Sequence, residues 1–410
     1  MRSVCEHDRN SVNVDRINMA SPLPRLTAAQ VAARLGVKPQ TVYAYVSRGL
    51  LRRERDAHGS TFDALEVETF AGARRRAAPA VVHPTTGMPL AVVHTDIADI
   101  EDGELLYRGR RARDLTERPF AEIVEWLWES ERENAPDPAI GSAREMVAAL
   151  PPHAGAMDRL RAALTGFAAD DPLRHDASPA TLHRIGWTLL TGLPVALGGD
   201  PHHDIARSLV SAWRAPVDDA TVAAVNAALI LLIDHDLAVS TFAARVAASA
   251  RADGYAAVSA ALGAADSPLH ISAAARTARL FARVRRGLEP ERALTEALQD
   301  GNGIPGFGHP LYPGIDDRAD ALFSFVARLP DGEPTMDAVR RLSDVVADRT
   351  RLRPNVDLAL AALASGARLP DEAASTIFVV GRLAGWIAHI RAEYAERPMR
   401  LRPRGEYVGR

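Results

Sequence analysis

Residues 301–312 read Gly301-Asn302-Gly303-Ile304-Pro305-Gly306-Phe307-Gly308-His309-Pro310-Leu311-Tyr312, and Arg318 follows six residues later. A loop this rich in glycine lets the main chain and an embedded histidine approach a ligand closely, because glycine has no side-chain barrier. The planar guanidinium of an arginine suits a carboxylate. The stretch therefore predicts a site for a polar metabolite rather than a structural turn.

The chain as a whole has the composition of a soluble globular protein. Its 410 residues, of which 47% are hydrophobic and 25% charged, suffice for two or three domains. The net charge of −3 excludes a chain dominated by affinity for nucleic acid, although it allows a local basic patch. The one cysteine, Cys5, excludes intramolecular disulfides and cysteine metal sites. We find no signal-peptide pattern and no apolar run of membrane-spanning length, so we expect a cytoplasmic protein with no metal and no membrane partner.

The first 50 residues contain a pattern of two short helices. Residues 1–24 are polar and aperiodic, and we expect them to be disordered. Residues 26–35 predict a helix with Thr27 as its N-cap, and residues 40–46 predict a second helix after the turn at residues 36–39. Helix, tight turn and helix form the pattern whose second helix can enter a major groove.

Basic residues follow this helical pair and suit a short wing. Residues 62–74 then predict a further helix. The segment 25–77 resembles the winged helix-turn-helix of the MerR and excisionase type, which implies DNA or another polyanion as its partner. The alternative is a small module that serves only protein packing. The candidate DNA contacts are Thr41, Tyr43, Arg52, Arg53 and Arg55.

From about residue 114 onward the sequence is mainly α in its periodicity. Before that point we expect a linker at residues 77–80 and two extended pieces, 91–95 and 104–109, with a turn at residues 101–103. Proline and glycine separate the helical runs, and no repeat of fixed period occurs. The clearest runs are 120–128, 143–150, 221–233, 240–263 and 371–396.

Two histidines interrupt apolar helical sequence at helix ends. His235 lies between Asp234 and Asp236, so a carboxylate can hold its ring in one tautomer. The alternative is a hydrogen-bonded core histidine. His270 precedes a helix that starts near Ser272, where the positive end of the helix dipole keeps an imidazole neutral. The alternative is an N-cap histidine without chemistry.

One carboxylate and two arginines occupy comparable positions. Asp357 lies in the first turn of a helix, where a carboxylate remains ionised as a base. The alternative is a simple complement to the helix dipole. Arg382, within apolar helical sequence, and Arg402, near residue 410, need partners because a buried charge is costly unless it is paired. That partner is a ligand carboxylate or, alternatively, a protein carboxylate.

Together with His309 and Arg318, these groups follow an order that resembles the citrate synthase family, which includes the 2-methylcitrate synthases. The resemblance covers roughly residues 84–410. It implies a mainly α, multi-helix fold with a large and a small domain, preceded by the winged helix-turn-helix. We expect the large domain at residues 78–270 and 364–410, and the small domain at residues 271–363. The motifs that carry the resemblance are 102–109, 120–128, 240–245, 306–309, 354–357, 381–389 and 402–409.

The resemblance also implies a reaction, the condensation of acetyl-CoA or propionyl-CoA with oxaloacetate to give citrate or 2-methylcitrate and CoA. Asp357 would take a proton from the carbon beside the thioester carbonyl. His270 would stabilise the enol oxygen, and His309 would polarise the ketone of oxaloacetate. No cofactor is implied.

Oxaloacetate would be held by the remaining polar residues of the motifs. His235 would help to orient it, and Arg318 and Arg382 would bind its carboxylates. Arg402 would be contributed by the neighbouring subunit, so a homodimer with a shared active site is implied. A dianionic 2-oxo acid needs several fixed arginines, which agrees with this set.

The chain departs from the family pattern at three places. After His270 it reads Ile271-Ser272-Ala273-Ala274 where Gly-Gly-Ala-Asn or a similar run is usual, and Pro313 replaces a frequent basic residue. Asp316-Asp317-Arg318 stands for Asp-Pro-Arg. A second interpretation therefore stays open, a DNA-binding regulator whose synthase-like domain senses a keto acid, tricarboxylate or acyl-CoA without turnover. A third is an acyl-CoA-binding or assembly protein with no DNA partner.

Overall fold

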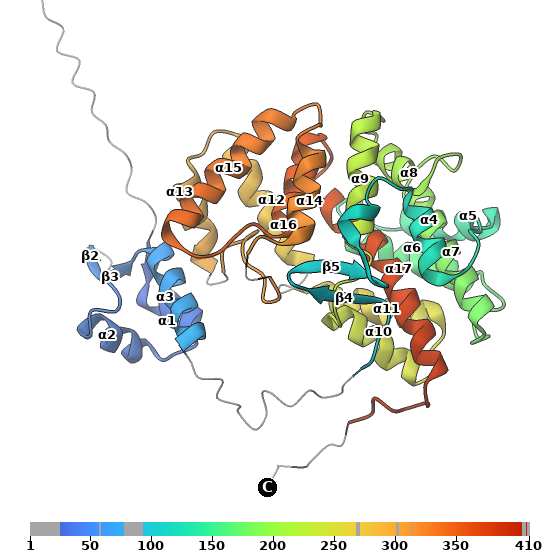
Figure 1. Cartoon of the computed structure of the whole chain (residues 1–410), viewed down its shortest axis with the longest axis horizontal. Coiled ribbons are helices and arrows are strands. Elements are labelled where there is room, and N and C mark those ends of the chain that lie inside the picture. Colours follow the sequence, from blue (N-terminus) through green and yellow to red (C-terminus); the bar gives the residue numbers. More distant parts are fainter. Residues whose placement is uncertain are drawn as a thin grey trace, which may run out of the picture.

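The computed structural model describes residues 25–56, 59–77, 93–267, 271–300, 303–312, 314–403 and 407. The expected disorder of residues 1–24 and the expected linker at residues 78–80 lie outside this set. Within it, seventeen α-helices and six short strands form a mainly helical molecule (Figure 1), as the periodicity predicts.

The N-terminal elements are small and begin with a capped helix. The side chain of Thr27 accepts a hydrogen bond from the Gln30 amide and Gly36 closes the helix in the left-handed conformation, which confirms the predicted cap. The three strands form an antiparallel sheet in the order β1-β3-β2. That these elements form a DNA-binding module stays a prediction. The elements are β1 (Leu26–Thr27), α1 (Ala28–Leu35), α2 (Pro39–Ser47), β2 (Glu54–Asp56), β3 (Gly59–Phe62) and α3 (Ala64–Ala77).

A second antiparallel sheet opens the larger part of the chain, and its first strand differs from our expectation. Residues 93–95 are not a strand, and β4 (Ala98–Glu101) pairs instead with β5 (Glu104–Tyr107), followed by β6 (Arg110–Arg111). Asp102 and Gly103 both have positive φ, 52° and 82°. Such a two-residue turn fixes the register of a hairpin, so the partner strand must directly precede it.

The helices of the larger part follow one another with short connections. The expected run 240–263 is two helices, because Arg251 leaves the helical conformation with φ 61° and Asp253 caps a new helix. The elements up to residue 265 are η1 (Ala112–Leu115), α4 (Phe120–Trp128), α5 (Asp137–Ala148), α6 (Ala156–Ala169), α7 (Pro179–Ala196), α8 (Ile205–Ala212), α9 (Asp219–Leu231), α10 (Val239–Ser249) and α11 (Gly254–Ala265). The later elements are α12 (Ile271–Arg285), α13 (Pro290–Ala297), η2 (Leu298–Asp300), α14 (Asp317–Val326), α15 (Gly332–Arg349), α16 (Val356–Gly366) and α17 (Ala373–Ala395).

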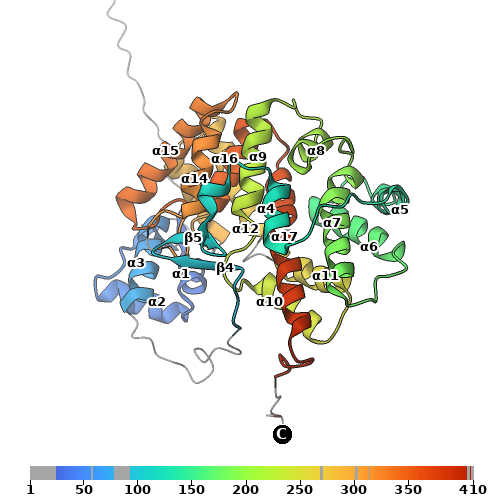
Figure 2. The same ribbon diagram turned by 45° about the vertical axis from the view of Figure 1, so that its right-hand side comes forward.

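The longest helix, α17, forms the centre of the core. Figure 2 shows it passing through the middle of the molecule, with α12 and α16 toward one side and α6 and α7 toward the other. Among the described residues α17 is the one helix long and apolar enough to cross a membrane, which corrects our statement that no apolar run has that length. Its apolar window is 94% buried inside the molecule. Burial against neighbouring helices explains the apolar sequence.

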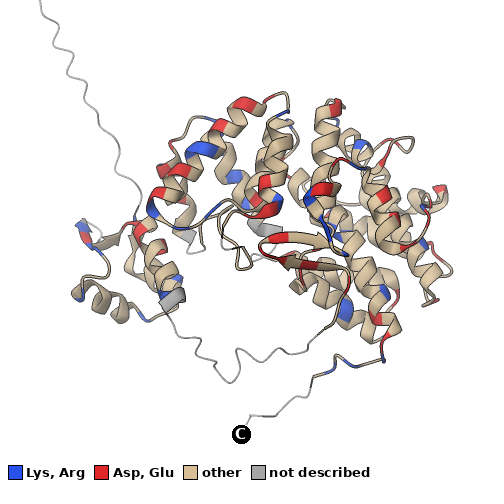
Figure 3. Cartoon of the chain, viewed as in Figure 1, with Lys and Arg blue, Asp and Glu red and all other residues tan. Residues whose placement is uncertain are grey.

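Charged side chains of both signs are interspersed along the outer helices (Figure 3). The N-terminal elements contact the later helices. Arg349 of α15 forms an ion pair with Asp63 at 3.3 Å, and its carbonyl accepts a hydrogen bond from the Thr69 hydroxyl of α3. Gln30 of α1 donates to the carbonyl of Gln299 at 2.8 Å. The N-terminal elements therefore lie beside η2 and the glycine-rich loop that follows it.

Candidate active site

The glycine-rich loop is held against the segment that begins α16. The Gly308 amide donates to the Arg353 carbonyl at 2.7 Å, and the Asn355 side-chain amide donates to the Gly308 carbonyl at 3.1 Å. Gly306 has a φ of 80°, and a β-carbon there would lie 2.7 Å from Thr277 Cγ2. This position needs glycine for both its conformation and its close packing. The loop and the start of α16 thus face one cavity together.

That cavity has a volume of about 670 Å³ and contains most of the predicted site residues. Five of them line it, and three further lining residues, Val239, Leu311 and Phe378, are apolar. His270 lies outside the described residues, although α12 begins at Ile271 as the sequence predicts. Arg402 is exposed and is not among the lining residues. The five that meet are His235, His309, Arg318, Asp357 and Arg382.

His309 is a neutral ring whose tautomer follows from the main chain. Burial, and then Arg318, lower its pKa to about 4. The Leu311 amide donates to Nδ1 of His309 at 3.2 Å. A ring nitrogen that accepts a hydrogen bond carries no proton, so the proton of the neutral ring is on Nε2. His309 can therefore donate from Nε2 to an oxygen atom of a ligand.

Asp357 is the carboxylate of the cavity, and its pKa differs from our expectation. Asn355 caps α16 by accepting from the Asp357 amide at 3.1 Å, which places Asp357 in the first helical turn. That position favours the ionised form. Burial nevertheless raises the pKa of Asp357 to about 6, with Arg318 opposing the increase and Asp316 adding to it. Desolvation is thus stronger here than the helix dipole.

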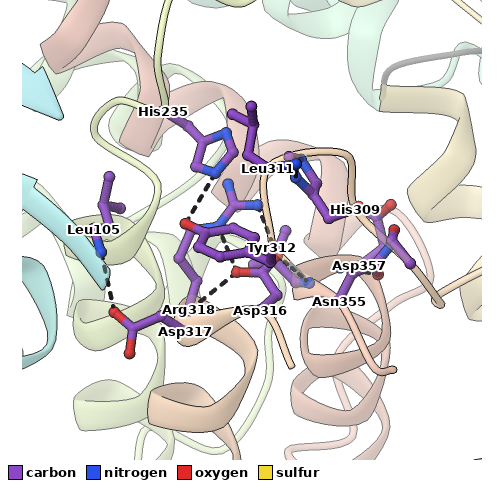
Figure 4. Close-up of polar contacts among 12 residues, drawn as sticks. Leu105, His235, His309, Leu311, Tyr312, Asp316, Asp317, Arg318, Asn355 and Asp357 are labelled. Atoms are coloured by element: carbon purple, nitrogen blue, oxygen red, sulfur yellow. Dashed lines mark hydrogen bonds and ion pairs between the residues drawn. The ribbon is translucent and has the colours of Figure 1, made fainter. Parts of the chain in front are cut away.

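Arg318 is anchored by Asp316, a residue whose role the sequence did not show. The two side chains form a bidentate pair, with Nε and Nη2 of Arg318 at 2.9 and 2.7 Å from the carboxylate oxygens (Figure 4). Asp316 also accepts from the Val356 amide at 3.1 Å. Burial alone would raise the pKa of Asp316, but Arg318 lowers it below the ordinary value. The pair fixes the guanidinium at the cavity wall.

Arg382 forms another part of the wall and is almost fully buried. Its Nε donates to the carbonyl of Leu232 at 2.8 Å, and its guanidinium lies 5.0 Å from the ring centre of Phe378. Burial lowers the pKa of Arg382 to about 10, while Asp234 opposes that decrease through space. A buried arginine with a carbonyl partner retains donors for an anionic ligand.

Two further residues of the site were not singled out from the sequence. Tyr312, part of the quoted loop, places its hydroxyl 3.0 Å from Nε2 of His235. Asp317 stands where the family pattern has proline, and it accepts from the Leu105 amide at 3.3 Å and from Arg113 at 3.0 Å. Their only sequence signal was adjacency to His309 and Arg318.

The remaining predicted residues lie apart from the cavity. Tyr43 of α2 is 43% exposed, and Thr41 is half-buried. Arg52, Arg53 and Arg55 are exposed at and before β2. Within the described ranges no group of three or more histidine, cysteine or acidic side chains is placed to hold a metal ion.

Comparison with known proteins identifies relatives along most of the chain. Residues 87–404 match the family model of the citrate synthase C-terminal domain. The chain is 28% identical over 344 residues to 2-methylcitrate synthase 2 of Corynebacterium glutamicum, covering 75% of this chain and 90% of that protein. It is 28% identical over 360 residues to 2-methylcitrate synthase of Mycobacterium tuberculosis, covering 80% and 89%.

Solved structures agree in fold. A ternary complex of carboxymethyl coenzyme A and oxaloacetate with citrate synthase from Thermoplasma acidophilum superposes with a TM-score of 0.64 at 24% identity, covering 78% of this chain and 94% of that one. Citrate synthase from Pyrobaculum aerophilum gives a TM-score of 0.65 at 22% identity, covering 88% and 95%. At these identities the likeness concerns the fold alone.

Proposed function

Because this chain belongs to the citrate synthase family, we propose that it condenses acetyl-CoA or propionyl-CoA with oxaloacetate to give citrate or 2-methylcitrate and CoA. Relatives named citrate synthase and 2-methylcitrate synthase support both acyl donors, and neither is favoured at 28% identity. The observation that carries the proposal is one cavity holding a carboxylate of raised pKa opposite a neutral histidine, Asp357 and His309.

The first proposed step is removal of a proton from the carbon beside the thioester carbonyl. Asp357, with a pKa of about 6, is ionised at neutral pH and is a stronger base than an ordinary aspartate. The resulting enolate or enol oxygen is assigned to His270, on the family resemblance alone. Withdrawal of water from a carboxylate that must accept a proton is how an enzyme matches the pKa of a base to its working pH.

The second step is formation of the carbon–carbon bond to the ketone carbon of oxaloacetate. The Nε2 proton of His309 is the donor available to polarise the ketone oxygen, which gains negative charge as the bond forms. Hydrolysis of the thioester then releases CoA. The proposal assigns no metal or cofactor, because the thioester supplies the activated acyl group.

The carboxylates of oxaloacetate are assigned to Arg318 and Arg382. Nε and Nη2 of Arg318 are taken by Asp316, so a ligand would meet its remaining nitrogen, Nη1. Arg402 is assigned to the site of a partner subunit in a homodimer, in line with its exposed position in this chain. A rigid set of arginines lowers the entropic cost of orienting the keto acid.

Thiol release from acetyl-CoA and propionyl-CoA, each with oxaloacetate, tests the enzyme proposal. We expect turnover with at least one donor, and a loss of about 10³-fold in Asp357→Ala. Asp344→Ala, which replaces an exposed aspartate of α15, serves as the matched control and should keep wild-type turnover. Absence of turnover with both donors would reject the proposal.

A second function is favoured by the exposed arginines of the N-terminal elements, namely DNA binding by a regulator that senses a keto acid, tricarboxylate or acyl-CoA. Binding of duplex DNA at several salt concentrations tests it. Combined replacement of Arg52, Arg53 and Arg55 by alanine should weaken binding and reduce the salt dependence by about three charges. The matched control is the alanine pair at Arg340 and Arg341, exposed arginines of α15. Failure to bind DNA at low salt would reject this function.

A further inference from the structure

The hydrogen bond between His235 and Tyr312 lies at the edge of the cavity. His235 is 6% exposed and lines the cavity, whereas Tyr312 is 4% exposed and does not. Nε2 of His235 and Oη of Tyr312 are 3.0 Å apart. In Figure 4 the other ring nitrogen of His235 is turned toward Leu311 and His309, which line the same cavity. With Nε2 occupied, Nδ1 is the nitrogen that His235 can offer to a ligand.

The charge states of the pair limit where the proton lies. Burial, then Arg318, Arg382 and His309, lower the pKa of His235 far below its ordinary value, so the ring is neutral. Burial raises the pKa of Tyr312 above that of a free phenol, so its hydroxyl keeps its proton. A neutral imidazole has one donor and one acceptor nitrogen, and the phenol can take either role. The pair therefore has two arrangements, distinguished by which nitrogen of His235 carries hydrogen.

The chemistry of the keto acid selects one arrangement. Oxaloacetate offers a ketone and two carboxylates, which are all acceptors at neutral pH. If Nε2 donated to Tyr312, Nδ1 would face the ligand with a lone pair and repel its oxygen atoms. If Tyr312 donates to Nε2, Nδ1 carries the hydrogen and faces the ligand as a donor. A buried acceptor facing an acceptor costs about 1–3 kcal/mol, enough to decide the tautomer.

We propose that Tyr312 is a positioning residue that donates its hydroxyl proton to Nε2 of His235 and so makes Nδ1–H of His235 a donor to the keto acid. The inference rests on the proposed function for the identity of the ligand. His309 reaches the same end by the opposite nitrogen, since the Leu311 amide occupies its Nδ1. The two rings are 4.7 Å apart and nearly perpendicular, with an interplanar angle of 89°. The cavity would then present two neutral imidazoles, each fixed as a donor by the loop 309–312.

Removal of the phenol hydroxyl is the first test. In Tyr312→Phe we expect the Kd for oxaloacetate, measured by calorimetry on the full chain, to rise about 10-fold, with kcat changed much less. Tyr255→Phe is the matched control, because Tyr255 is also buried and its hydroxyl donates to Asp171 at the same 3.0 Å, away from the cavity. The control should leave the Kd unchanged. An unchanged Kd in Tyr312→Phe would overturn the inference.

Amide replacements of the histidine test which nitrogen faces the ligand. The side-chain nitrogen of asparagine matches the place of Nδ1, and that of glutamine matches Nε2. His235→Asn should therefore bind oxaloacetate more tightly than His235→Gln, and the reverse order would contradict the assignment.

Nitrogen-15 spectra of histidine-labelled protein report the tautomer directly, with His235→Gln identifying the signals. The wild type should show a protonated Nδ1, and Tyr312→Phe should show a mixture of tautomers. A wild-type ring protonated at Nε2 would refute the inference whatever the ligand is. If the wild type fails to bind oxaloacetate while the spectra show protonated Nδ1, the proposed function fails and the Tyr312 hydrogen bond stands.

Discussion

At the level of single residues, Asp357 shows how two local effects compete. Its position in the first turn of α16 favours a carboxylate, and on that ground an ionised residue of ordinary acidity was expected. Burial in the cavity wall has the opposite effect and raises its pKa to about 6. The same burial lowers the pKa of His309 to about 4, because desolvation disfavours whichever form is charged. Base and donor thus acquire suitable protonation states from one cause.

The first prediction concerns the pH dependence of Asp357. Turnover requires its ionised form, so kcat/KM should fall as the pH drops below about 6. Because the pKa is raised in the folded state, the stabilising effect of the proton is present at acid pH and is lost as the pH rises through 6. Asp357→Asn should therefore lose turnover yet exceed the wild type in unfolding free energy by about 1 kcal/mol at pH 8.

Denaturant unfolding at pH 4 and pH 8, with turnover measured across the same range, checks both parts. The stability difference between Asp357→Asn and the wild type should shrink toward pH 4. A pH-independent difference, or a kcat/KM limb near pH 4, would show that the carboxylate is not desolvated as described.

At the level of elements, the approach of α17 to the segment after α9 positions the substrate side of the cavity. A β-carbon at Gly385 would lie 2.0 Å from the Ile233 carbonyl oxygen, and one at Gly381 would lie 2.7 Å from that of Leu229. These glycines let two buried helices come into main-chain contact. The contact sets the distance between Arg382, on α17, and His235, two residues after Ile233.

The second prediction uses this contact. Gly385→Ala should lower the unfolding free energy by about 3 kcal/mol, because neither main chain can move without disturbing the core. Gly263→Ala is the control, since a β-carbon there meets nothing within 4 Å and alanine is the better helix former. The control should gain about 0.5–1 kcal/mol. Thermal and denaturant unfolding of the two variants measures the contrast, and similar effects would show that α17 tolerates displacement.

At the level of the whole molecule, a buried ionic network connects segments far apart in the sequence. Arg245 of α10 donates to Glu393 at 3.0 Å and to Nδ1 of His389 at 2.9 Å, both on α17. His389 in turn contacts Asp234, beside His235, at 2.9 Å. Arg400 also pairs with Glu393, at 2.5 Å. The network thus joins the floor of the cavity to the segment that carries Arg402.

The third prediction is a large cost for breaking this network. Arg245→Ala should lower the unfolding free energy by about 3–5 kcal/mol, because it leaves a fully buried Glu393 with less of its countercharge. Arg207→Ala removes a pair with Asp219 that is open to solvent, and it should cost less than about 1 kcal/mol. Equal costs in equilibrium unfolding would contradict the importance given to burial.

Much of the fold followed from the sequence, for reasons that particular elements make clear. The helix over α9 and the cap at Thr27 were predicted because apolar period and capping chemistry act over a few residues. The start of the first hairpin strand was misplaced by several residues, because the turn at Asp102 and Gly103 selects its partner. The single run 240–263 proved to be two helices, since alanine gives no signal of where a helix ends.

For the site, the sequence by itself determined which residue types are present and their order, and this order identified His235, His309, Arg318, Asp357 and Arg382 together. Only the tertiary structure decided how those groups behave. The bidentate pair of Asp316 and Arg318, the raised pKa of Asp357 and the contact of Tyr312 with His235 depend on burial and on distances between separate elements. Local sequence cannot specify such terms, because desolvation and hydrogen bonding are properties of the packed molecule.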